Sequence, residues 1–343
     1  MDGRAPDDGE AGGRIKAPAD DAGPFPAARR RRILFTMPEL PEIVTYLHAF
    51  RSRIVGEPLE AVRLRSPSLL RTFQPPLSAV HGRRVTGLRR LGKRIVWELE
   101  GDLFLVFHLM VTGRFHRKKA GAPLPKKNVH AAFDFPGESY FLTEMAKQKK
   151  ASLHLVAGEA GLAALDAGGT EPLEATAEAF RDALLRENRT LKRALTDPRI
   201  LSGIGNAHSD EILHAARLSP VQRTRNLTPD EVERLRRAVV DDLTTWTRRL
   251  AEETGDAFPE KITAFHPRMG VHGRFGEPCP VCGDTVQRIV YAQRETNYCP
   301  TCQTGGKLLA DRALSRLLGE DWPRTLEELE DHLAARRGPG GEP

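Results

Sequence analysis

The chain has 343 residues, of which 40% are hydrophobic and 29% are charged, and its formal net charge is +6. That length is sufficient for two domains and a small appendage, and no apolar run is long enough for a membrane span or a signal peptide. We therefore expect a soluble, cytoplasmic protein, and the basic balance is compatible with a polyanionic partner such as nucleic acid.

The first 36 residues are rich in Asp, Gly, Ala and Pro and end in the basic run Arg29–Arg32. They contain too few large apolar side chains to bury a core, so we predict a disordered extension. The segment carries seven basic and six acidic residues, which leaves +5 of the net charge of +6 on the rest of the chain. The simplest explanation of these 36 residues is a start codon wrongly assigned upstream of Met37, and a regulatory or localising tail is the alternative.

The segment Met37-Pro38-Glu39 can place a nucleophile beside a carboxylate. A proline nitrogen inside a chain is a tertiary amide with no available lone pair, whereas a terminal proline is a secondary amine. This interpretation requires a polypeptide that begins at Met37 and then loses that methionine. An ordinary loop is the alternative, because proline commonly marks turns.

A block of strands is predicted after the amino-terminal helix. Residues 94–100 alternate apolar and polar side chains, Gly101-Asp102 forms a turn, and residues 103–109 are continuously apolar. This pattern is typical of a hairpin within a sheet. Residues 129–135 and 139–142 predict a second antiparallel pair, and the stretch 157–171, rich in Gly and Ala, indicates a linker.

A block of helices is predicted from about Thr176. The sequence Thr228-Pro229-Asp230-Glu231 is a capping box with proline at the first helical position, and the apolar periodicity after it is typical of a helix packed on a core. Upstream, Gly203-Ile204-Gly205-Asn206 forms a glycine-rich turn before another helix. Such a turn can present backbone amides to a phosphate, and a plain tight turn is the alternative.

The four cysteines form two pairs, Cys279-x2-Cys282 and Cys299-x2-Cys302. This spacing is typical of two thiolate-bearing turns that a hairpin brings together around a tetrahedral zinc ion. Disulfides are the alternative, which an intracellular chain rarely keeps. Because four thiolates leave no open coordination position, we expect one structural Zn2+ that takes no part in the chemistry. Arg294 lies near the predicted tip of the hairpin.

Four separated motifs resemble those of the formamidopyrimidine-DNA glycosylase and endonuclease eight family of base-excision repair enzymes. They are Pro38-Glu39-Leu40-Pro41-Glu42, Gly92-Lys93, Leu195-Thr196-Asp197 with the glycine-rich turn, and the cysteine pairs with Gln293-Arg294. The Pro-Glu-Leu-Pro-Glu segment is closer to formamidopyrimidine-DNA glycosylase than to endonuclease eight. The resemblance runs from Pro38 to about Gln303 and implies an α+β multidomain fold with an amino-terminal β-sandwich and leading helix, a helix-two-turn-helix DNA-binding domain and a carboxy-terminal zinc hairpin.

The division of the chain that we expect follows from this organisation. The segments are an extension or mis-assigned start (1–36), a catalytic β-sandwich domain (37–156), a linker (157–175), a helix-two-turn-helix domain (176–268), a zinc-finger hairpin (269–303) and a helical extension with a tail (304–343). The leucines between Leu308 and Leu318 predict an amphipathic helix in the last segment, packed against the body of the protein.

The resemblance implies a bifunctional DNA glycosylase and abasic-site lyase. Its partner would be double-stranded DNA with damaged bases or abasic sites, bound by a monomer in a bacterial nucleoid. Pro38 would attack the anomeric carbon of the deoxyribose and form an imine, and Glu39 would move protons at the sugar. The resemblance also implies roles for five other residues. Lys93 and Arg294 would act with the catalytic groups, and Glu42 would support them. Lys192, Asn206 and also Arg294 would contact phosphates.

The chain departs from the family in the parts that contact the lesion. The family sequence His-Leu-Gly-Met-Ser-Gly is His108 to Gly113 here, with methionine displaced by one position to Met110, which in a strand would reverse its face. The family's Asp-Pro-Arg-Arg-Phe-Gly segment is replaced around residues 143–150, and residues 254–269 are shorter than the loop that covers 8-oxoguanine in formamidopyrimidine glycosylases. Oxidised pyrimidines, ring-opened bases and unusual DNA structures therefore remain candidate substrates.

Two other functions remain compatible with the sequence. One is a catalytically silent relative that binds damaged DNA or junctions, which the replaced segments favour. The other is a zinc-hairpin protein that binds RNA or acts in transcription, which accounts for the charge and the cysteines but leaves Pro38, Glu39 and Asn206 unexplained.

Overall fold

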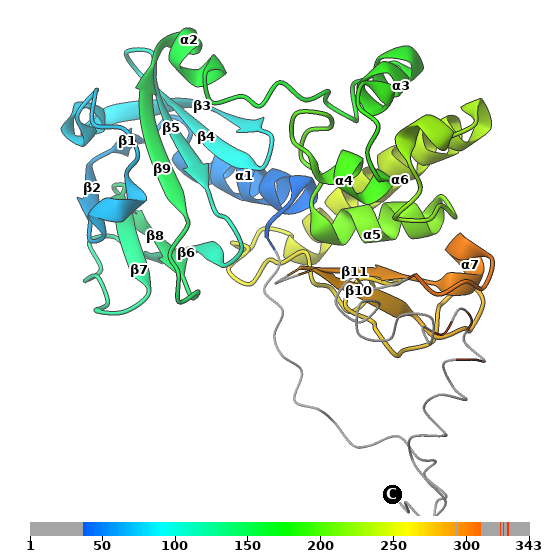
Figure 1. The fold of residues 1–343 in the computed structure, drawn as a ribbon. Helices are drawn as coiled ribbons and strands as arrows, with labels where there is room; N and C mark the ends of the chain where they lie inside the picture. The colour runs from blue at the N-terminus through cyan, green and yellow to red at the C-terminus, as the bar shows by residue number, and fades with distance from the viewer. Residues whose placement is uncertain (1–36, 292–293, 310–322, 324, 326–327, 329–343) are drawn as a thin grey trace, which may run out of the picture.

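The structure is a computed structural model that describes residues 37–291 and 294–309 together with Pro323, Thr325 and Glu328 (Figure 1). The predicted extension (1–36) and most of the predicted carboxy-terminal helix lie outside the described residues. The described chain has a half made of sheets and a half made of helices, with a small hairpin beside the helices. None of the helices in these ranges has the length and apolar character needed to cross a membrane.

The amino-terminal half follows α1 (Leu40–Ile54) and contains two antiparallel sheets, with strand orders β1-β3-β4-β5-β9 and β2-β7-β8-β6. The strands are β1 (Pro58–Leu59), β2 (Ala61–Leu64), β3 (Arg83–Leu91), β4 (Arg94–Leu99), β5 (Leu103–His108), β6 (Gly113–Lys119), β7 (Val129–Asp134), β8 (Glu138–Glu144) and β9 (Ser152–Ala157). Both predicted hairpins are confirmed, because β4 pairs with β5 and β7 pairs with β8.

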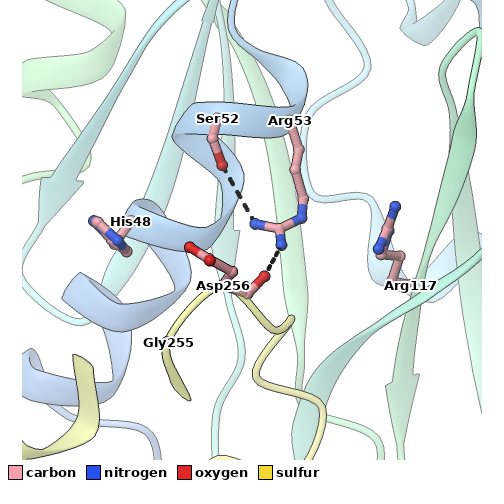
Figure 2. Close-up of a pocket in the computed structure, with 6 residues that line it drawn as sticks. All are labelled: His48, Ser52, Arg53, Arg117, Gly255 and Asp256. Atoms are coloured by element: carbon pink, nitrogen blue, oxygen red, sulfur yellow. Dashed lines mark hydrogen bonds between the residues drawn. The ribbon is translucent and has the colours of Figure 1, made fainter. Parts of the chain in front are cut away.

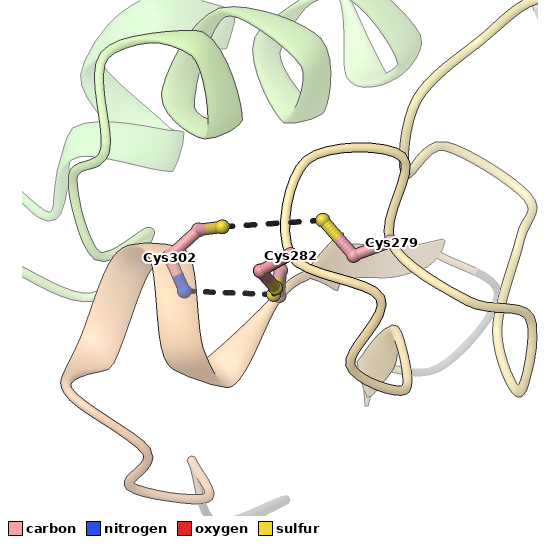
Figure 3. A group of neighbouring side chains, drawn as sticks. Cys279, Cys282 and Cys302 are labelled. Carbon is pink, nitrogen blue, oxygen red and sulfur yellow. Dashed lines mark hydrogen bonds between the residues drawn. The ribbon is translucent and has the colours of Figure 1, made fainter.

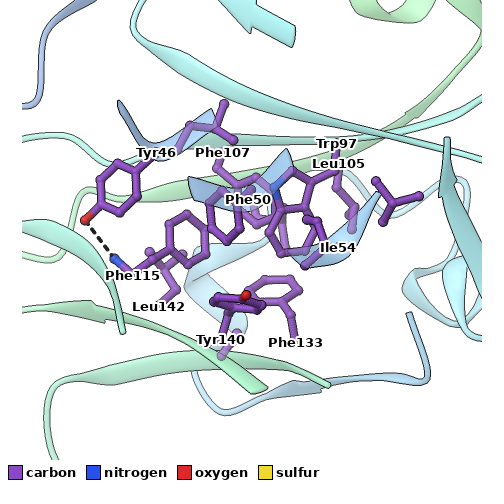
Figure 4. Packing of buried hydrophobic residues seen from close by; sticks show 14 of the residues in the cluster. Tyr46, Phe50, Ile54, Trp97, Leu105, Phe107, Phe115, Phe133, Tyr140 and Leu142 are labelled. Atoms are coloured by element: carbon purple, nitrogen blue, oxygen red, sulfur yellow. Dashed lines mark hydrogen bonds between the residues drawn. The ribbon is translucent and has the colours of Figure 1, made fainter. Parts of the chain in front are cut away.

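An aromatic core packs α1 against the two sheets (Figure 4). The ring centroid of Phe50 lies 5.1 Å from that of Trp97 in one sheet and 5.0 Å from that of Tyr140 in the other. Both contacts are edge-on, which the charge distribution of aromatic rings favours. Tyr46 adds a hydrogen bond that its hydroxyl accepts from the Phe115 amide, and burial raises the pKa of Tyr46 to about 12. The helix is therefore fixed against both sheets.

The second half is helical. Its helices are α3 (Ala177–Leu185), α4 (Leu191–Thr196), α5 (Asn206–Ala215) and α6 (Pro229–Thr254), with a 3-10 turn at Thr224–Asn226. Two further 3-10 turns, at Pro67–Leu69 and Leu77–Val80, lie in the sheet half between β2 and β3. The capping box predicted for α6 is present, because Thr228 and Glu231 exchange hydrogen bonds between side chain and backbone. The stretch 157–171 is more than a linker, since it contains α2 (Gly158–Ala163) and Thr170 forms a bridge with Leu201.

Leu40, the first residue of α1, belongs to a different core from Tyr46 and Phe50 of that helix. Leu40 packs with buried residues of α4, α5 and α6, whereas Tyr46 and Phe50 pack between the sheets. The Leu40 N–H also donates to the Gly203 carbonyl at 3.0 Å. The amino-terminal end of α1 therefore lies at the junction of the two halves, which places Glu39 against the loop that precedes α5.

The hairpin predicted between the cysteine pairs is confirmed. β10 (Gln287–Tyr291) and β11 (Arg294–Tyr298) are antiparallel, and α7 (Pro300–Thr304) follows them. Figure 1 shows β11 alongside α5, and Asn206 Nδ2 donates to the Glu295 carbonyl at 2.9 Å. The hairpin is thus tied to the helical half beside the start of α5.

Candidate active site

Glu39 is held at the amino-terminal end of α5. Its side chain is fully buried, and its carboxylate accepts hydrogen bonds from the amides of Gly205 at 2.6 Å, Ala207 at 2.8 Å and His208 at 3.3 Å. A helix start favours negative charge because its first amides lack partners within the helix and the helix dipole is positive there. The carboxylate is therefore fixed one residue away from Pro38, which is also buried.

The glycines of the turn before α5 are explained by close approach. A Cβ atom at Gly205 would lie 2.4 Å from the Glu39 carboxyl carbon, and Gly203 has a φ of +82°, which residues with side chains rarely adopt. We predicted that this turn could present its amides to a phosphate. The amides of Gly205, Ala207 and His208 donate to Glu39 instead, so the phosphate interpretation is wrong for them.

Lys93 reaches the same turn from the sheet half. It lies between β3 and β4, where Gly92 turns the chain with a φ of +60°, and its Nζ donates to the Ile204 carbonyl at 3.0 Å. Lys93 is therefore held at the junction and is not a solvated lysine on a strand. Three segments far apart in the sequence meet here: the start of α1, the turn before β4 and the loop before α5.

Glu42 lies one helical turn after Glu39 and is also buried. One carboxylate oxygen of Glu42 accepts the Glu39 N–H at 2.7 Å, and the other lies 3.6 Å from His208 Nε2. Glu42 is therefore a buried carboxylate and not one on the helix surface. By accepting the Glu39 N–H, Glu42 orients Glu39, whose carboxylate lies beside Pro38.

The predicted phosphate contacts lie next to this site. Lys192 Nζ donates to the Asn206 carbonyl at 2.6 Å and to the buried carboxylate of Asp210 at 2.5 Å. Asn206 in turn contacts Glu295 through its side chain. Arg294 precedes Glu295 in β11, so its backbone lies in the same region, and its side chain lies outside what the structure describes.

The sequence analysis missed two buried titratable residues beside the site. His208 Nδ1 lies 2.7 Å from Asp242 Oδ2, and the His208 side chain is fully buried. A signal for His208 was present, because residues 206–211 are mostly polar and yet open a helix that packs in a core. Polar side chains in such a place need buried partners.

The segment between β5 and β6 is a turn and not part of a strand. β5 ends at His108, β6 begins at Gly113, and Met110 has a φ of +53°. Our inference that the displaced methionine faces the opposite side of a strand is therefore wrong. Met110 is half-buried, whereas the side chain of Val111 is 40% exposed.

A second exposed apolar side chain lies on the loop after β8. Met145 is 57% exposed, and the next amide, that of Ala146, donates to Thr112 Oγ1 at 3.0 Å. Buried Glu144 fixes the other end of this loop by accepting a hydrogen bond from the Lys150 amide at 2.9 Å. The two loops are thus joined, and each presents one apolar side chain.

The four cysteines form a site that fits a tetrahedral metal. Their Sγ atoms all lie within 4.8 Å of one another, and Figure 3 shows Cys279 and Cys282 facing Cys302. Four thiolates match a structural zinc, which has no open coordination position and holds two turns together when it is bound. His214 Nε2 lies 3.2 Å from Cys279 Sγ, so α5 also contacts the ligand set. These contacts support one structural Zn2+.

Two surface hollows lie outside the Glu39 site. A pocket of about 330 Å3 is lined by His48, Ser52 and Arg53 near the carboxy-terminal end of α1 (Figure 2). At 1.5 Å per residue, α1 is roughly 20 Å long, so this pocket lies at the other end of the helix from Pro38. A groove of about 440 Å3 is lined by charged side chains of α5 and α6, and it includes Asp242.

Comparisons with known proteins agree along the chain. Family models match for the formamidopyrimidine-DNA glycosylase N-terminal domain over residues 37–149, the formamidopyrimidine-DNA glycosylase H2TH domain over 169–252 and the zinc finger found in FPG and IleRS over 276–305. The formamidopyrimidine-DNA glycosylase of Heliobacterium modesticaldum is 34% identical over 281 residues, which are 78% of this chain and 100% of the relative.

Solved structures of the Lactococcus lactis enzyme have the same fold. Its complex with DNA containing an abasic site has a TM-score of 0.69 and 25% identity, and covers 78% of this chain and 99% of that chain. Its complex with DNA containing an oxidised pyrimidine has a TM-score of 0.69 and 26% identity, and covers 78% and 100%.

The fold and the buried carboxylate site define a base-excision repair enzyme of the DNA glycosylase and abasic-site lyase class. The chain belongs to the formamidopyrimidine-DNA glycosylase family. The predicted α+β fold with its helix-two-turn-helix domain and zinc hairpin is confirmed. Membership also sets aside the RNA-binding or transcription-associated function.

Proposed function

We propose that the Pro38 nitrogen, freed by removal of the residues before it, is the nucleophile of base excision. The family match begins at Met37, and Pro38 lies buried where the two halves meet. The amine would attack C1′ of the damaged nucleotide, the glycosidic bond would break, and the base would leave with the bonding electrons and take up the proton that the amine releases. The C1′–O4′ bond would then open, with O4′ taking the bonding electrons and a proton, and the nitrogen lone pair would complete an iminium between Pro38 and C1′.

Glu39 is proposed to move protons at the sugar. The observation that carries this function is the fixation of its carboxylate by three amides, one residue from the nucleophile. A positioned carboxylate accepts a proton effectively and donates it once it has been protonated. The iminium acidifies the hydrogen on C2′, so loss of that proton expels the 3′ phosphate and breaks the strand. Hydrolysis of the iminium then frees the amine.

The cations around the site are proposed to bind DNA phosphates. Lys93, Lys192 and Arg294 come from the sheet half, the helical half and the hairpin, so together they span the junction. Asn206 joins the helical half to the hairpin. Phosphate contacts set the position of the duplex and make binding dependent on salt, and they carry no sequence information.

We further propose that the protein is a monomer and that it associates with a bacterial nucleoid in the cytoplasm.

The proposed substrates are oxidised pyrimidines, ring-opened bases and abasic sites. The Lactococcus lactis enzyme was solved with DNA containing an oxidised pyrimidine and with abasic-site DNA. The segment after α6 supports this choice, because Ile262 is buried in the sheet core and Met269 packs beside Trp246. These two contacts tie the segment to the body of the protein, which restricts its ability to cover an extruded 8-oxoguanine. Extrusion itself costs a few kcal/mol, and least for a damaged base.

Borohydride trapping on abasic duplex DNA tests the nucleophile. Protein produced from Met37, with removal of the methionine verified by mass spectrometry, should form a covalent adduct. Pro38→Gly should impair trapping, because it replaces the secondary amine, and protein that keeps residues 1–37 should form none. Absence of an adduct with a verified Pro38 amino terminus would overturn the proposed function.

A further inference from the structure

We propose that His208 is a positioning residue for excision, a buried cation that holds Glu42 and Glu39 in register behind the nucleophile. The inference rests on the proposed function, since it takes the Pro38 end of α1 as the reacting end. His208 lies in the first turn of α5, where its side chain is fully buried. It neither contacts the zinc ligands nor belongs to the predicted phosphate contacts.

The contacts of His208 connect α1 and α5 through a ring of neighbouring residues. Its Nε2 lies 3.6 Å from one oxygen of Glu42, and the other oxygen of Glu42 accepts the Glu39 N–H. The Glu39 carboxylate returns to α5, where it accepts the backbone N–H of His208 itself. A change in the charge of this imidazole is therefore transmitted to the backbone and the side chain of Glu39.

The charges around His208 explain why a cation is needed there. Three carboxylates face it, because the buried Glu39 and Glu42 approach from the start of α1 and Asp242, whose side chain is 8% exposed, approaches from α6. The ring centroid of Trp246 lies 6.1 Å from that of His208, and the negative charge of Glu211, on the next turn of α5, raises the pKa of Asp242. Buried carboxylates that lack a counter-charge are costly.

Proton affinities agree with this geometry. Burial by itself lowers the pKa of His208, but the attraction of Asp242 and then of Glu42 outweighs burial and holds that pKa well above its usual range. Burial raises the pKa of Asp242 to about 6, against the opposing effect of His208. His208 is therefore charged at neutral pH, and Asp242 loses its negative charge as the pH falls through about 6.

The test compares His208→Gln with wild-type protein that begins at Pro38. Glutamine retains a hydrogen-bonding side chain and removes the charge. The single-turnover rate of excision from DNA with an oxidised pyrimidine should fall about 10- to 100-fold, the loss expected when a catalytic group is misplaced by about 1 Å. The DNA dissociation constant and borohydride trapping on abasic DNA should be unchanged. A defect in folding alone would lower all three.

The pH profile provides a readout that a purely structural role would not change. Without the His208 cation, burial of Asp242 is unopposed, so the acid limb of the excision rate should move above its wild-type position near pH 6. Asp242→Asn should remove that limb. The neighbouring Asp241→Asn, which lines the same groove but is exposed, is the matched control and should match wild type.

A second variant keeps the test decisive if His208→Gln does not fold. Asp242→Asn leaves the imidazole in place and removes its strongest partner. The rate of excision should therefore fall while trapping is unchanged, as for His208→Gln, and the fall in the rate should be smaller. Wild-type excision rate and pH profile in a folded His208→Gln or Asp242→Asn variant would overturn this inference and leave the proposed function intact. No adduct from wild-type protein would overturn both.

Discussion

The reacting end of α1 and the two loops that carry Val111 and Met145 differ in how their side chains are held. Glu39 and Glu42 are buried, and each carboxylate accepts hydrogen bonds from backbone amides. Val111 and Met145 are exposed, and their loops are held by other residues, such as Thr112, whose Oγ1 accepts the Ala146 N–H. Removing a partner from a buried polar group leaves it unsatisfied, whereas exposed side chains can change at little cost to the fold. We propose that the reacting groups are built into the fold in this way, and that Val111 and Met145 contact the DNA at the lesion.

Removal of zinc should give the largest effect and should separate the hairpin from the rest of the molecule. Structural zinc contributes on the order of 10 kcal/mol or more in zinc-finger peptides. A chelator should release one zinc per chain, abolish DNA binding and remove amide-exchange protection from residues 276–305. Protection in the sheets should persist, because the aromatic core does not depend on the cysteines. Retention of DNA binding by the zinc-free protein would contradict this expectation.

Glu39→Gln should abolish excision and spare the fold. The amide side chain has one acceptor oxygen where the carboxylate has two, and it cannot serve as a base, so a loss of about 10²- to 10⁴-fold is expected. Single-turnover excision from lesion-containing DNA measures the effect, and trapping on abasic DNA is the internal control because no base has to leave. Excision at the wild-type rate would show that another group moves the proton.

Gly205→Ala tests whether the close approach at the start of α5 fixes Glu39. The added Cβ would lie 2.4 Å from the Glu39 carboxyl carbon, so one of the two must move. Excision should fall about 100-fold, as expected for a displacement of about 1 Å. Gly137→Ala is the matched control, because its Cβ would meet no atom within 4 Å. Equal rates for the two variants would contradict the role of this contact.

Val111→Ala and Met145→Ala should have the smallest effects and should act on recognition alone. Complete burial of such a side chain contributes roughly 1.5–3 kcal/mol, so partial burial against DNA predicts about tenfold weaker binding to lesion-containing duplexes. Thermal stability should not change, because both side chains are exposed. Phe73→Ala, another exposed apolar side chain, is the control. If thermal stability fell together with DNA binding, these side chains would support the fold and would not act on recognition alone.

Much of the fold could be predicted because its signals are local. The hairpins, the capping box of α6 and the cysteine pairs each depend on residues close in sequence. The relation of Glu39 to the start of α5 could not be predicted, because it joins residues more than 160 positions apart. The motif glycines suggested a phosphate site, and only the tertiary contact shows that a carboxylate of the chain itself occupies those amides. Met110 was misplaced because its left-handed conformation is unusual for a residue with a side chain.

The division of α1 between two cores has a mechanical consequence. Leu40, its first residue, is packed with the helical half, and Tyr46 and Phe50 are packed with the sheets. α6 is divided in the same way, because Leu243 lies in the helical core and Leu250 in the sheet core. A rotation of one half relative to the other would therefore have to act on both helices, and the residues beside these shared segments, Pro38 and Glu39 among them, would be displaced least.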